Sequence, residues 1–187
     1  MKLSRGKSLF LLGVVLVVID QVSKILVKTN MDLGEQFNVI GDWFRILFIE
    51  NKGMAFGMSF GGVLGKYLLT SFRIILFSVI CWWISRLLKR EDRVPAGVLA
   101  GLTLIAAGAL GNIIDCLFYG LVFEPHAPFM QGRVVDMLYF PLIDTYVGGH
   151  HITFFDPVFN FADSCVTVGA FYLILFHWKF FCKGIII

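Results

Sequence analysis

The chain has 187 residues, of which 58% are hydrophobic and 16% are charged. A soluble domain is usually about 45–50% apolar and about 25% charged, so this chain has too few polar residues to cover a water-facing surface. The composition therefore excludes a soluble enzyme and indicates an integral membrane protein. The formal net charge of +3 is small and the basic residues form short clusters, so nucleic acid is not an expected partner.

Four apolar stretches have the length of a membrane-spanning helix, which is about 20 residues. They cover about residues 8–27, 67–88, 95–118 and 159–181. The first follows a basic segment, as in a signal peptide, but it has no small-residue cleavage site and continues past the length of a signal-peptide core. We therefore expect an uncleaved first helix and a single integral membrane domain over residues 1–187.

Basic residues mark one side of the membrane. They precede the first stretch, connect the second to the third, and follow the fourth: Lys2, Arg5, Lys7, Arg86, Lys89, Arg90, Arg93, Lys179 and Lys183. Such clusters favour the cytoplasmic side, so both chain termini are expected to be cytoplasmic. The longer connections, about residues 28–66 and 119–158, are then expected outside.

Each outer connection contains a segment with the composition of a β-strand. These segments are Phe44–Glu50 and the region around Val134 to Leu142, and the first is flanked by turn residues. Unpaired strand edges are not stable in lipid. The predicted fold is therefore a mainly α membrane protein, with four transmembrane helices and a small extracytoplasmic β-sheet cradle.

Polar residues occur at one depth in all four predicted helices, near their outer ends. Each ionisable residue inside a span costs about 2.5–3.5 kcal/mol at the helix centre, so each needs a reason. Their common depth predicts a polar site just below the outer surface. The residues are Asp20, Lys24, Arg73, Asn112, Asp115, Asn160 and Asp163.

Several of these residues also have a purely structural interpretation. Asp20 and Lys24 are four residues apart on one helical face and can neutralise each other. Arg73 can extend its guanidinium toward the lipid headgroups. Asn160 and Asp163 can cap the start of the last helix. The structural and functional interpretations are compatible.

Asp136 interrupts an apolar segment in the second outer connection. Alone, it has the features of a solvated residue at a strand edge. If the chain brings it to Asp163, the two carboxylates would share one proton, because repulsion and partial desolvation disfavour two charges. This is the arrangement of aspartic proteases, in which one carboxylate accepts a proton from water and the other donates to the scissile carbonyl.

Other kinds of site have little support. His126, His150 and His151 match no standard metal-ligand spacing, so no metal is predicted, and no Ser–His–Asp pattern occurs. The cysteines show no C-x-x-C spacing and are interpreted as buried small apolar residues: Cys81, Cys116, Cys165 and Cys182.

The chain resembles the bacterial lipoprotein signal peptidases, the signal peptidase II family, over nearly its whole length. The resemblance rests on five motifs in their order and spacing: Asp20-Gln-Val-Ser-Lys24, Glu50-Asn-Lys-Gly-Met-Ala-Phe56, Gly108 to Asp115, Val134-Val-Asp136 and Phe159-Asn-Phe-Ala-Asp-Ser164. It implies a multi-pass aspartyl endopeptidase of the bacterial cytoplasmic (inner) membrane, with its active site near the outer face. The family's catalytic aspartates match Asp136 and Asp163.

The resemblance also implies supporting residues and a substrate. Structural support and substrate placement fall to Asp20, Lys24, Asn51, Gly53, Asn112, Asp115 and Asn160. The implied reaction removes signal peptides from diacylglyceryl-modified prolipoproteins, cutting before the lipidated cysteine. A substrate that is part helix and part lipid enters from the bilayer. No metal or organic cofactor is expected, and the enzyme is expected to be a monomer.

The sequence departs from the family pattern in two places. Cys116 stands where the family usually has Arg after the motif aspartate, and Arg133 is a candidate replacement for that positive charge. The segment 121–132 is longer than usual, and the sequence is compatible with either a lid or an elaborated loop there.

Two other functions compete with the protease. A small proton- or ion-coupled transporter would use Asp20, Lys24, Asp115 and Asp163 as a relay. Against it, no polar group continues the path inward, and no inverted repeat is apparent. A non-catalytic scaffold or lipid-binding protein would need the aspartates for stability only.

Overall fold

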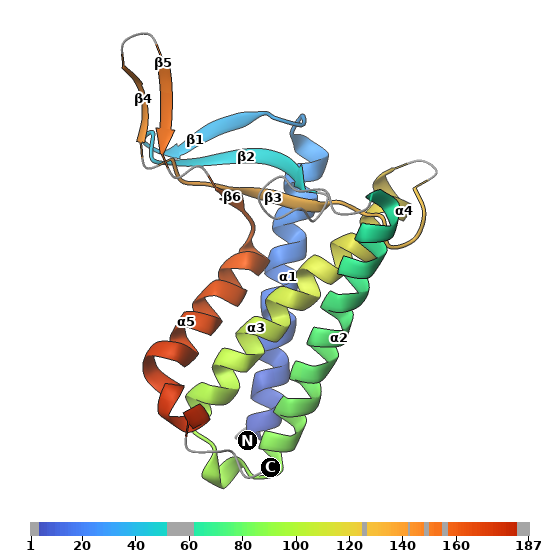
Figure 1. Ribbon diagram of the computed structural model, residues 1–187, viewed down its shortest axis with the longest axis vertical. Helices are drawn as coiled ribbons and strands as arrows, with labels where there is room; N and C mark the ends of the chain where they lie inside the picture. The colour runs from blue at the N-terminus through green and yellow to red at the C-terminus, as the bar shows by residue number, and fades with distance from the viewer. Residues whose placement is uncertain are drawn as a thin grey trace.

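The structure is a computed structural model, and it describes residues 4–51, 62–124, 127–141, 143–147, 150–154 and 157–182. Within 143–154 only the backbone is described. Gly53 and His126 lie outside the described residues, and so do the side chains of His150 and His151. The described part of the chain forms a bundle of long helices with a small sheet across one end (Figure 1).

Four helices in the described residues are long and apolar enough to cross a membrane. They are α1 (Arg5–Asn30), α2 (Gly62–Leu88), the continuous helical segment Ala96–Phe123, and α5 (Phe161–Cys182). The prediction of four apolar helices is confirmed. Each helix can extend beyond the lipid, so the helices and the predicted spans differ by a few residues at their ends.

The third helical segment changes geometry near the sheet. It consists of α3 (Ala96–Ile114), a π-helical turn η2 (Asp115–Tyr119) and the short helix α4 (Gly120–Phe123). A π-helical turn inserts an extra residue into the helical register and often occurs at functional sites. Here it contains Asp115 and Cys116, two residues that the sequence placed near the outer end of this helix.

The central helix is α3. In its most apolar 18-residue window 61% of the residues are buried, against 6–17% for the other three helices. Apolar side chains of α2, α3, α5 and the turn between α2 and α3 form one core: Leu87, Val94, Val98, Leu99, Leu102 and Leu173. The outer faces of the other helices expose large apolar side chains, including Phe10, Leu64 and Phe176, as expected for contact with lipid.

The sheet has four antiparallel strands in the order β1-β2-β3-β6. They are β1 (Gln36–Ile40), β2 (Phe44–Asn51), β3 (Val134–Tyr139) and β6 (Val158–Phe159). The predicted strand segments correspond to β2 and β3. However, β3 ends before Pro141, which has no backbone N–H for a strand ladder. The prediction missed the other strands, including the separate hairpin of β4 (Ile143–Val147) and β5 (His150–Phe154).

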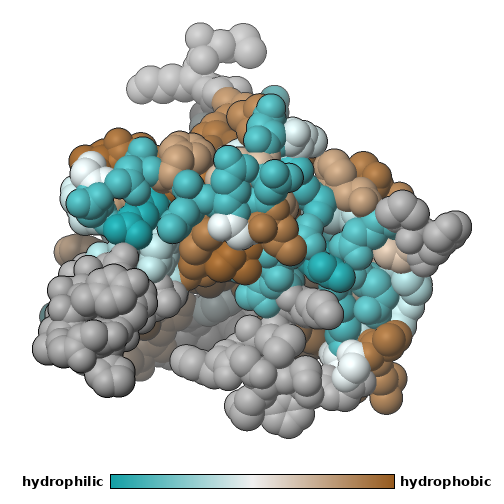
Figure 2. Space-filling model, turned by 90° about the horizontal axis from the view of Figure 1, so that it is seen from above, coloured by the Kyte–Doolittle hydropathy of each residue, from teal (hydrophilic) through white to brown (hydrophobic). Residues whose placement is uncertain are grey.

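A second core joins the sheet to the helices, and it contains Val27, Phe48, Tyr119, Val135 and Met137. Figure 2 views the molecule from this end, where hydrophilic residues surround a central hydrophobic area. The start of α1, the end of α5 and the 3-10 turn η1 (Glu91–Arg93) lie at the opposite end of the bundle (Figure 1). The fold therefore separates the basic clusters from the sheet.

The four cysteines are all free thiols. Cys116 and Cys165 are buried, as predicted, whereas Cys81 is half-buried and Cys182 is exposed. The prediction of burial is wrong for Cys182, because an apolar side chain on the outside of a membrane helix needs no protein cover.

Candidate functional site

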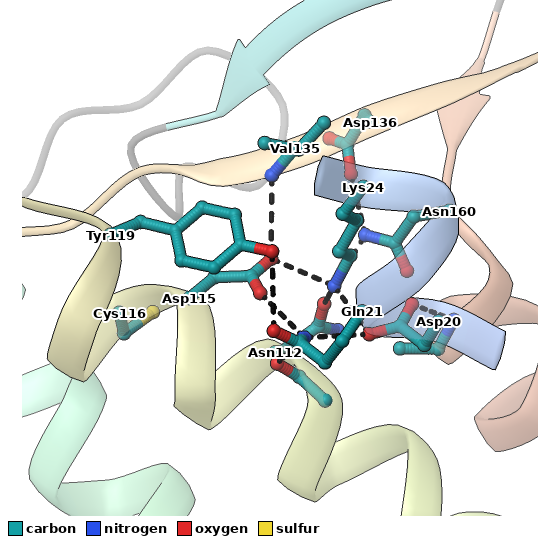
Figure 3. Close-up of polar contacts among 12 residues, drawn as sticks. Asp20, Gln21, Lys24, Asn112, Asp115, Cys116, Tyr119, Val135, Asp136 and Asn160 are labelled. Atoms are coloured by element: carbon teal, nitrogen blue, oxygen red, sulfur yellow. Dashed lines mark hydrogen bonds and ion pairs between the residues drawn. The ribbon is translucent and has the colours of Figure 1, made fainter. Parts of the chain in front are cut away.

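The polar residues of the helices meet directly beneath the sheet. Figure 3 shows side chains from α1, α3, η2, β3 and the start of α5 converging on one cluster. The close contact of α3 with α5 depends on glycine. A Cβ atom at Gly108 would lie 2.2 Å from the carbonyl oxygen of Ala162, and one at Gly111 would lie 2.4 Å from Asp20 Oδ2. Small residues at these positions let the helices approach closely.

Lys24 is the cation at the centre of this cluster, and its side chain is completely buried. Its Nζ lies 2.9 Å from Asp20 Oδ2 and 2.7 Å from Asp115 Oδ2. It also donates a hydrogen bond to Asn112 Oδ1 at 3.0 Å. A buried charge needs such partners, because desolvation costs several kcal/mol per ion. The two buried carboxylates and the one ammonium leave one formal negative charge.

Asp20 connects α1 to the first turn of α5. Its Oδ1 accepts a hydrogen bond from the backbone N–H of Ala162 at 2.9 Å. A carboxylate at this end of a helix also interacts favourably with the helix dipole. The structural interpretation of Asp20 and Lys24 as a neutralising pair is thus confirmed, and the pair extends to Asp115 and to α5.

Two residues of this network, Gln21 and Tyr119, were not predicted as site residues. Gln21 donates hydrogen bonds to Asp115 Oδ1 at 2.9 Å and to the carbonyl of Gly111 at 3.1 Å. Tyr119 donates to Gln21 Oε1 at 3.1 Å. Gln21 lies within the motif from Asp20 to Lys24, and that was the available signal. Tyr119 gave none, since an aromatic residue near a helix end is usually core or interfacial.

Asn112 links the buried cation to Asp163. Its Oδ1 accepts hydrogen bonds from Lys24 and, at 3.2 Å, from Asn160 Nδ2. With the oxygen occupied by two donors, the amide nitrogen must face the other way, where it donates to Asp163 Oδ1 at 2.8 Å. Lys24 therefore determines which way the Asn112 amide points.

Asn160 joins the two aspartates that the sequence suggested as a pair. Its Nδ2 donates to Asp136 Oδ1 at 2.7 Å, and its Oδ1 accepts from the backbone N–H of Asp163 at 2.8 Å. The second bond is the N-cap predicted for the last helix. One completely buried amide side chain thus contacts Asp136 from β3 and Asp163 from α5, although the two residues come from different elements.

The two carboxylates have different surroundings. Both oxygens of Asp136 accept amide hydrogen bonds, since Asn51 Nδ2 also donates to Oδ2 at 3.2 Å. Asp163 accepts through Oδ1, and its Oδ2 has no partner among the described residues. Burial, followed by repulsion from Asp163, raises the pKa of Asp136 to about 6.

The described contacts of the Arg133 guanidinium are with carboxylates, and none is with the Cys116 side chain. The guanidinium pairs with Glu50 Oε2 at 3.1 Å and lies 3.7 Å from Glu124 Oε1, and Glu50 also pairs with Lys28. The cation beside Cys116 is instead Arg73 of α2, whose Nη1 is 3.2 Å from the Cys116 sulfur. The replacement of the family's Arg by Arg133 stays a prediction, and the Arg133 guanidinium is paired with Glu50 in this structure.

The described part of the long segment 121–132 is attached at several points. The helix continues through Phe123, and the N–H of Gly132 donates to the carbonyl of Cys116 at 3.0 Å. The carbonyl of Gln131 accepts from Lys66 at 2.7 Å. Phe129 forms an edge-on contact with Phe118, with ring centroids 6.3 Å apart. These contacts favour a fixed loop over a lid for residues 127–132.

The residues that form this site also occur in the sequence motifs of one protein family. The model of that family, described as signal peptidase (SPase) II, matches residues 12–179, which is most of the chain. The chain belongs to the signal peptidase II family. Its function is accordingly that of a lipoprotein signal peptidase, a protease, and the known class for this family is aspartic. The comparisons do not support the transporter alternative.

Relatives of this signal peptidase II cover most of its length. A lipoprotein signal peptidase of Porphyromonas gingivalis is 42% identical over 195 residues, covering 93% of this chain and 84% of the relative. One from Amoebophilus asiaticus is 39% identical over 174 residues, covering 85% of this chain and 72% of the relative. The matched regions cover most of this chain in both cases.

Two solved structures have the same fold. Both are bacterial membrane enzymes determined by the in meso method, at 2.3 Å and 1.9 Å resolution. The first has a TM-score of 0.65 and 26% identity, covering 95% of this chain and 92% of its own. The second has a TM-score of 0.61 and 28% identity, covering 90% and 91%. This signal peptidase II is thus a multi-pass membrane protein.

Proposed function

We propose that this signal peptidase II cuts diacylglyceryl-modified prolipoproteins before the lipidated cysteine, with Asp136 and Asp163 as its catalytic pair. The observation that carries the proposal is the bridge of Asn160 between the Asp136 carboxylate and the backbone of Asp163. Because Asn160 fixes the Asp136 carboxylate relative to the backbone of Asp163, the two carboxylates can share a proton and act on one peptide bond.

The different surroundings of the carboxylates suggest their roles. The raised pKa of Asp136 favours the proton on this residue. Asp163 Oδ2, which has no partner among the residues that the structure describes, can accept a proton from water. The water oxygen then attacks the scissile carbonyl carbon while Asp136 donates its proton to the carbonyl oxygen. As the tetrahedral intermediate collapses, the C–N bond breaks, Asp163 passes the proton taken from water to the leaving amine, and one hydroxyl of the intermediate returns its proton to Asp136, which restores both carboxyl groups.

The remaining residues position this pair. Asn51, Asn112 and Asn160 orient the two carboxylates through the hydrogen bonds described above. Asp20, Lys24 and Asp115 hold Asn112 and the start of α5. The proposed role of Gly53 in substrate placement concerns a position outside the described residues, and Arg133 supports the site through its ion pair with Glu50.

The proposed placement is the bacterial cytoplasmic membrane, with the whole chain 1–187 as one membrane domain and a single copy as the active unit. The basic clusters lie at the end of the bundle away from the sheet, which favours that end in the cytoplasm. The site and the sheet are then at the outer face. The apolar outer surfaces of the helices give a lipidated substrate access from the bilayer.

The substrate requirement can be tested with purified enzyme in lipid nanodiscs. A prolipoprotein is presented with and without its diacylglyceryl group, and the products are analysed by mass spectrometry. The proposal predicts cleavage of the modified form alone, with the lipidated cysteine at the new N-terminus. Equal cleavage of both forms, or cleavage at another bond, would contradict the proposed substrate.

A further inference from the structure

Arg73 is a charged residue within a membrane-spanning helix. It lies on α2, it is half-buried, and its Nη1 contacts the sulfur of Cys116 at 3.2 Å. The Cys116 side chain is buried in the π-helical turn and follows Asp115, the partner of Lys24. The guanidinium is therefore directed into the protein against the polar cluster, and not to lipid headgroups as its structural interpretation predicted.

Within the described part of the chain, most hydrogen-bond donors of the Arg73 guanidinium have no acceptor. A guanidinium has five N–H groups, and a cysteine sulfur is only a weak acceptor. Among the residues that the structure describes, Arg73 forms no ion pair and no second hydrogen bond. Asp115, the carboxylate that precedes Cys116 in the chain, is already held by Lys24 and Gln21. A charge in a membrane helix that has no ion pair among the described residues is costly, which points to a ligand that pairs with it.

The small side chain at position 116 makes this arrangement possible. A long side chain there would compete with the guanidinium of Arg73 for the same space. The motif of the signal peptidase II family usually has Arg at this position of the third helix. In this chain, Arg73 of α2 brings a positive charge to the same position. The positive charge is thus kept, but the helix that carries it has changed.

We infer that Arg73 binds a carbonyl oxygen of the substrate on the α2 side of the polar cluster. This inference rests on the proposed function. A lipidated peptide in the bilayer brings two kinds of carbonyl acceptor, the peptide carbonyls near the scissile bond and the ester carbonyls of the diacylglyceryl group. Either can accept hydrogen bonds from a planar guanidinium fork.

The test compares kcat/KM for prolipoprotein cleavage in nanodiscs among four enzymes. They are the wild type, Arg73→Met, the double variant Arg73→Met/Cys116→Arg, and the control Arg86→Met. Arg86 lies on the same helix and stacks on Trp82, with its guanidinium carbon 5.5 Å from the ring centroid. Loss of a charged hydrogen bond predicts a decrease of roughly 10- to 100-fold for Arg73→Met, mainly through KM. The double variant should recover most of it, and Arg86→Met should match the wild type.

A second substrate identifies the carbonyl that is bound. In a dialkylglyceryl prolipoprotein, ether linkages replace the ester carbonyls. If Arg73 binds an ester carbonyl, Arg73→Met and the wild type should cleave this ether-linked substrate with equal kcat/KM. If it binds a peptide carbonyl, the loss should be equal on both substrates. Either result supports the inference.

Three results separate failure of the inference from other causes. Unchanged kcat/KM for Arg73→Met on both substrates would overturn it, and so would a folded double variant no better than the single variant. Methionine favours insertion of α2, and Arg73→Gln gives a second variant if Arg73→Met does not fold. A wild-type enzyme that cuts neither substrate would instead overturn the proposed function.

Discussion

Lys24 is the residue on which the geometry of the site most depends. It pairs with Asp20 and Asp115 and, through Asn112 Oδ1, directs the amide nitrogen of Asn112 to Asp163. Its four-residue spacing from Asp20 was readable in the sequence. Its contacts with α3 were not, because spacing along one helix gives no information about which residues of another helix face it.

Replacement of Lys24 by Met should destabilise the protein by about 3–5 kcal/mol, because it leaves two buried carboxylates without a cation. SDS-induced unfolding followed by circular dichroism measures this change. Lys89→Met is the matched control, since Lys89 is exposed at the opposite end of the bundle. Equal stability of the two variants would show that the buried ion pairs do not hold the site together.

The raised pKa of Asp136 should make the stability of the folded protein depend on pH. This pKa is about 6 in the folded protein, above the value of about 3.9 in an unfolded chain. The stabilisation from its protonated form is therefore fully present below about pH 4 and is lost as the pH rises through about 6. Above that pH, the folded state carries the cost of a buried charge.

Asp136→Asn should remove this dependence, because asparagine does not ionise. The stability of the variant relative to the wild type should increase between pH 4 and pH 7.5. Thermal unfolding in detergent at both values measures the difference. A difference that stays constant, or that changes in the opposite direction, would show that Asp136 does not have a raised pKa.

Other residues show where the sequence was informative about the site. Asn160 was predicted as an N-cap and as a support for the aspartates, and one side chain does both through its two amide atoms. Arg73 was interpreted as a residue that reaches the headgroups. Its inward direction depends on the small Cys116 side chain of another helix, so α2 alone could not reveal it.

At the scale of elements, the contact between α3 and α5 brings Asn112 to Asp163. Gly108 lies where a Cβ atom would be 2.2 Å from a backbone oxygen of Ala162, so the separation of these helices depends on its missing side chain. A glycine within a membrane helix permits another helix to approach closely. The sequence did not predict which helix would be the neighbour.

Gly108→Ala should destabilise the protein by about 1–3 kcal/mol, because the backbone of α5 must move. It should also lower cleavage activity by displacing Asp163. Gly13→Ala is the matched control, since its Cβ would meet no atom closer than 3.7 Å and alanine favours a helix by up to about 1 kcal/mol. SDS-induced unfolding and a cleavage assay measure both effects. Wild-type values for Gly108→Ala would rule out a close-packed contact.

The sheet was predicted less completely than the helices. β2 and β3 have clear strand composition, whereas β6 has two residues and β1 has five exposed ones. β1 and β6 are the edge strands, and their pairing with β2 and β3 defines them more than their own pattern does. Asp136, the polar residue of β3, pairs with Ile49 of β2, and this pairing places it in the sheet above the helices.

At the scale of the whole molecule, composition and apolar length were sufficient to predict four helices. Lipid leaves few alternatives to a helix for an apolar segment of about 20 residues. The convergence of polar residues at one depth predicted the general position of the site. The arrangement of helices around α3 and the order of strands arise from packing between distant segments. A single sequence does not reveal this packing.

The proposed orientation can be tested by thiol labelling of intact spheroplasts with a membrane-impermeant maleimide. Asn38→Cys, on the exposed strand β1, should react from outside. Lys89→Cys should react only after the membrane is permeabilised, because basic clusters favour the cytoplasmic side. The wild type corrects for its own cysteines. Labelling in the reverse order would show that the sheet faces the cytoplasm.

The most direct test of the central claim measures the rate of prolipoprotein cleavage by Asp136→Asn and Asp163→Asn. Asp32→Asn is the control, because Asp32 is exposed near the sheet and away from the paired carboxylates. If Asp136 and Asp163 are the catalytic pair, each replacement should lower kcat by roughly 1,000-fold or more in a folded enzyme, while Asp32→Asn keeps the wild-type rate. Cleavage at the wild-type rate by either variant would contradict the account.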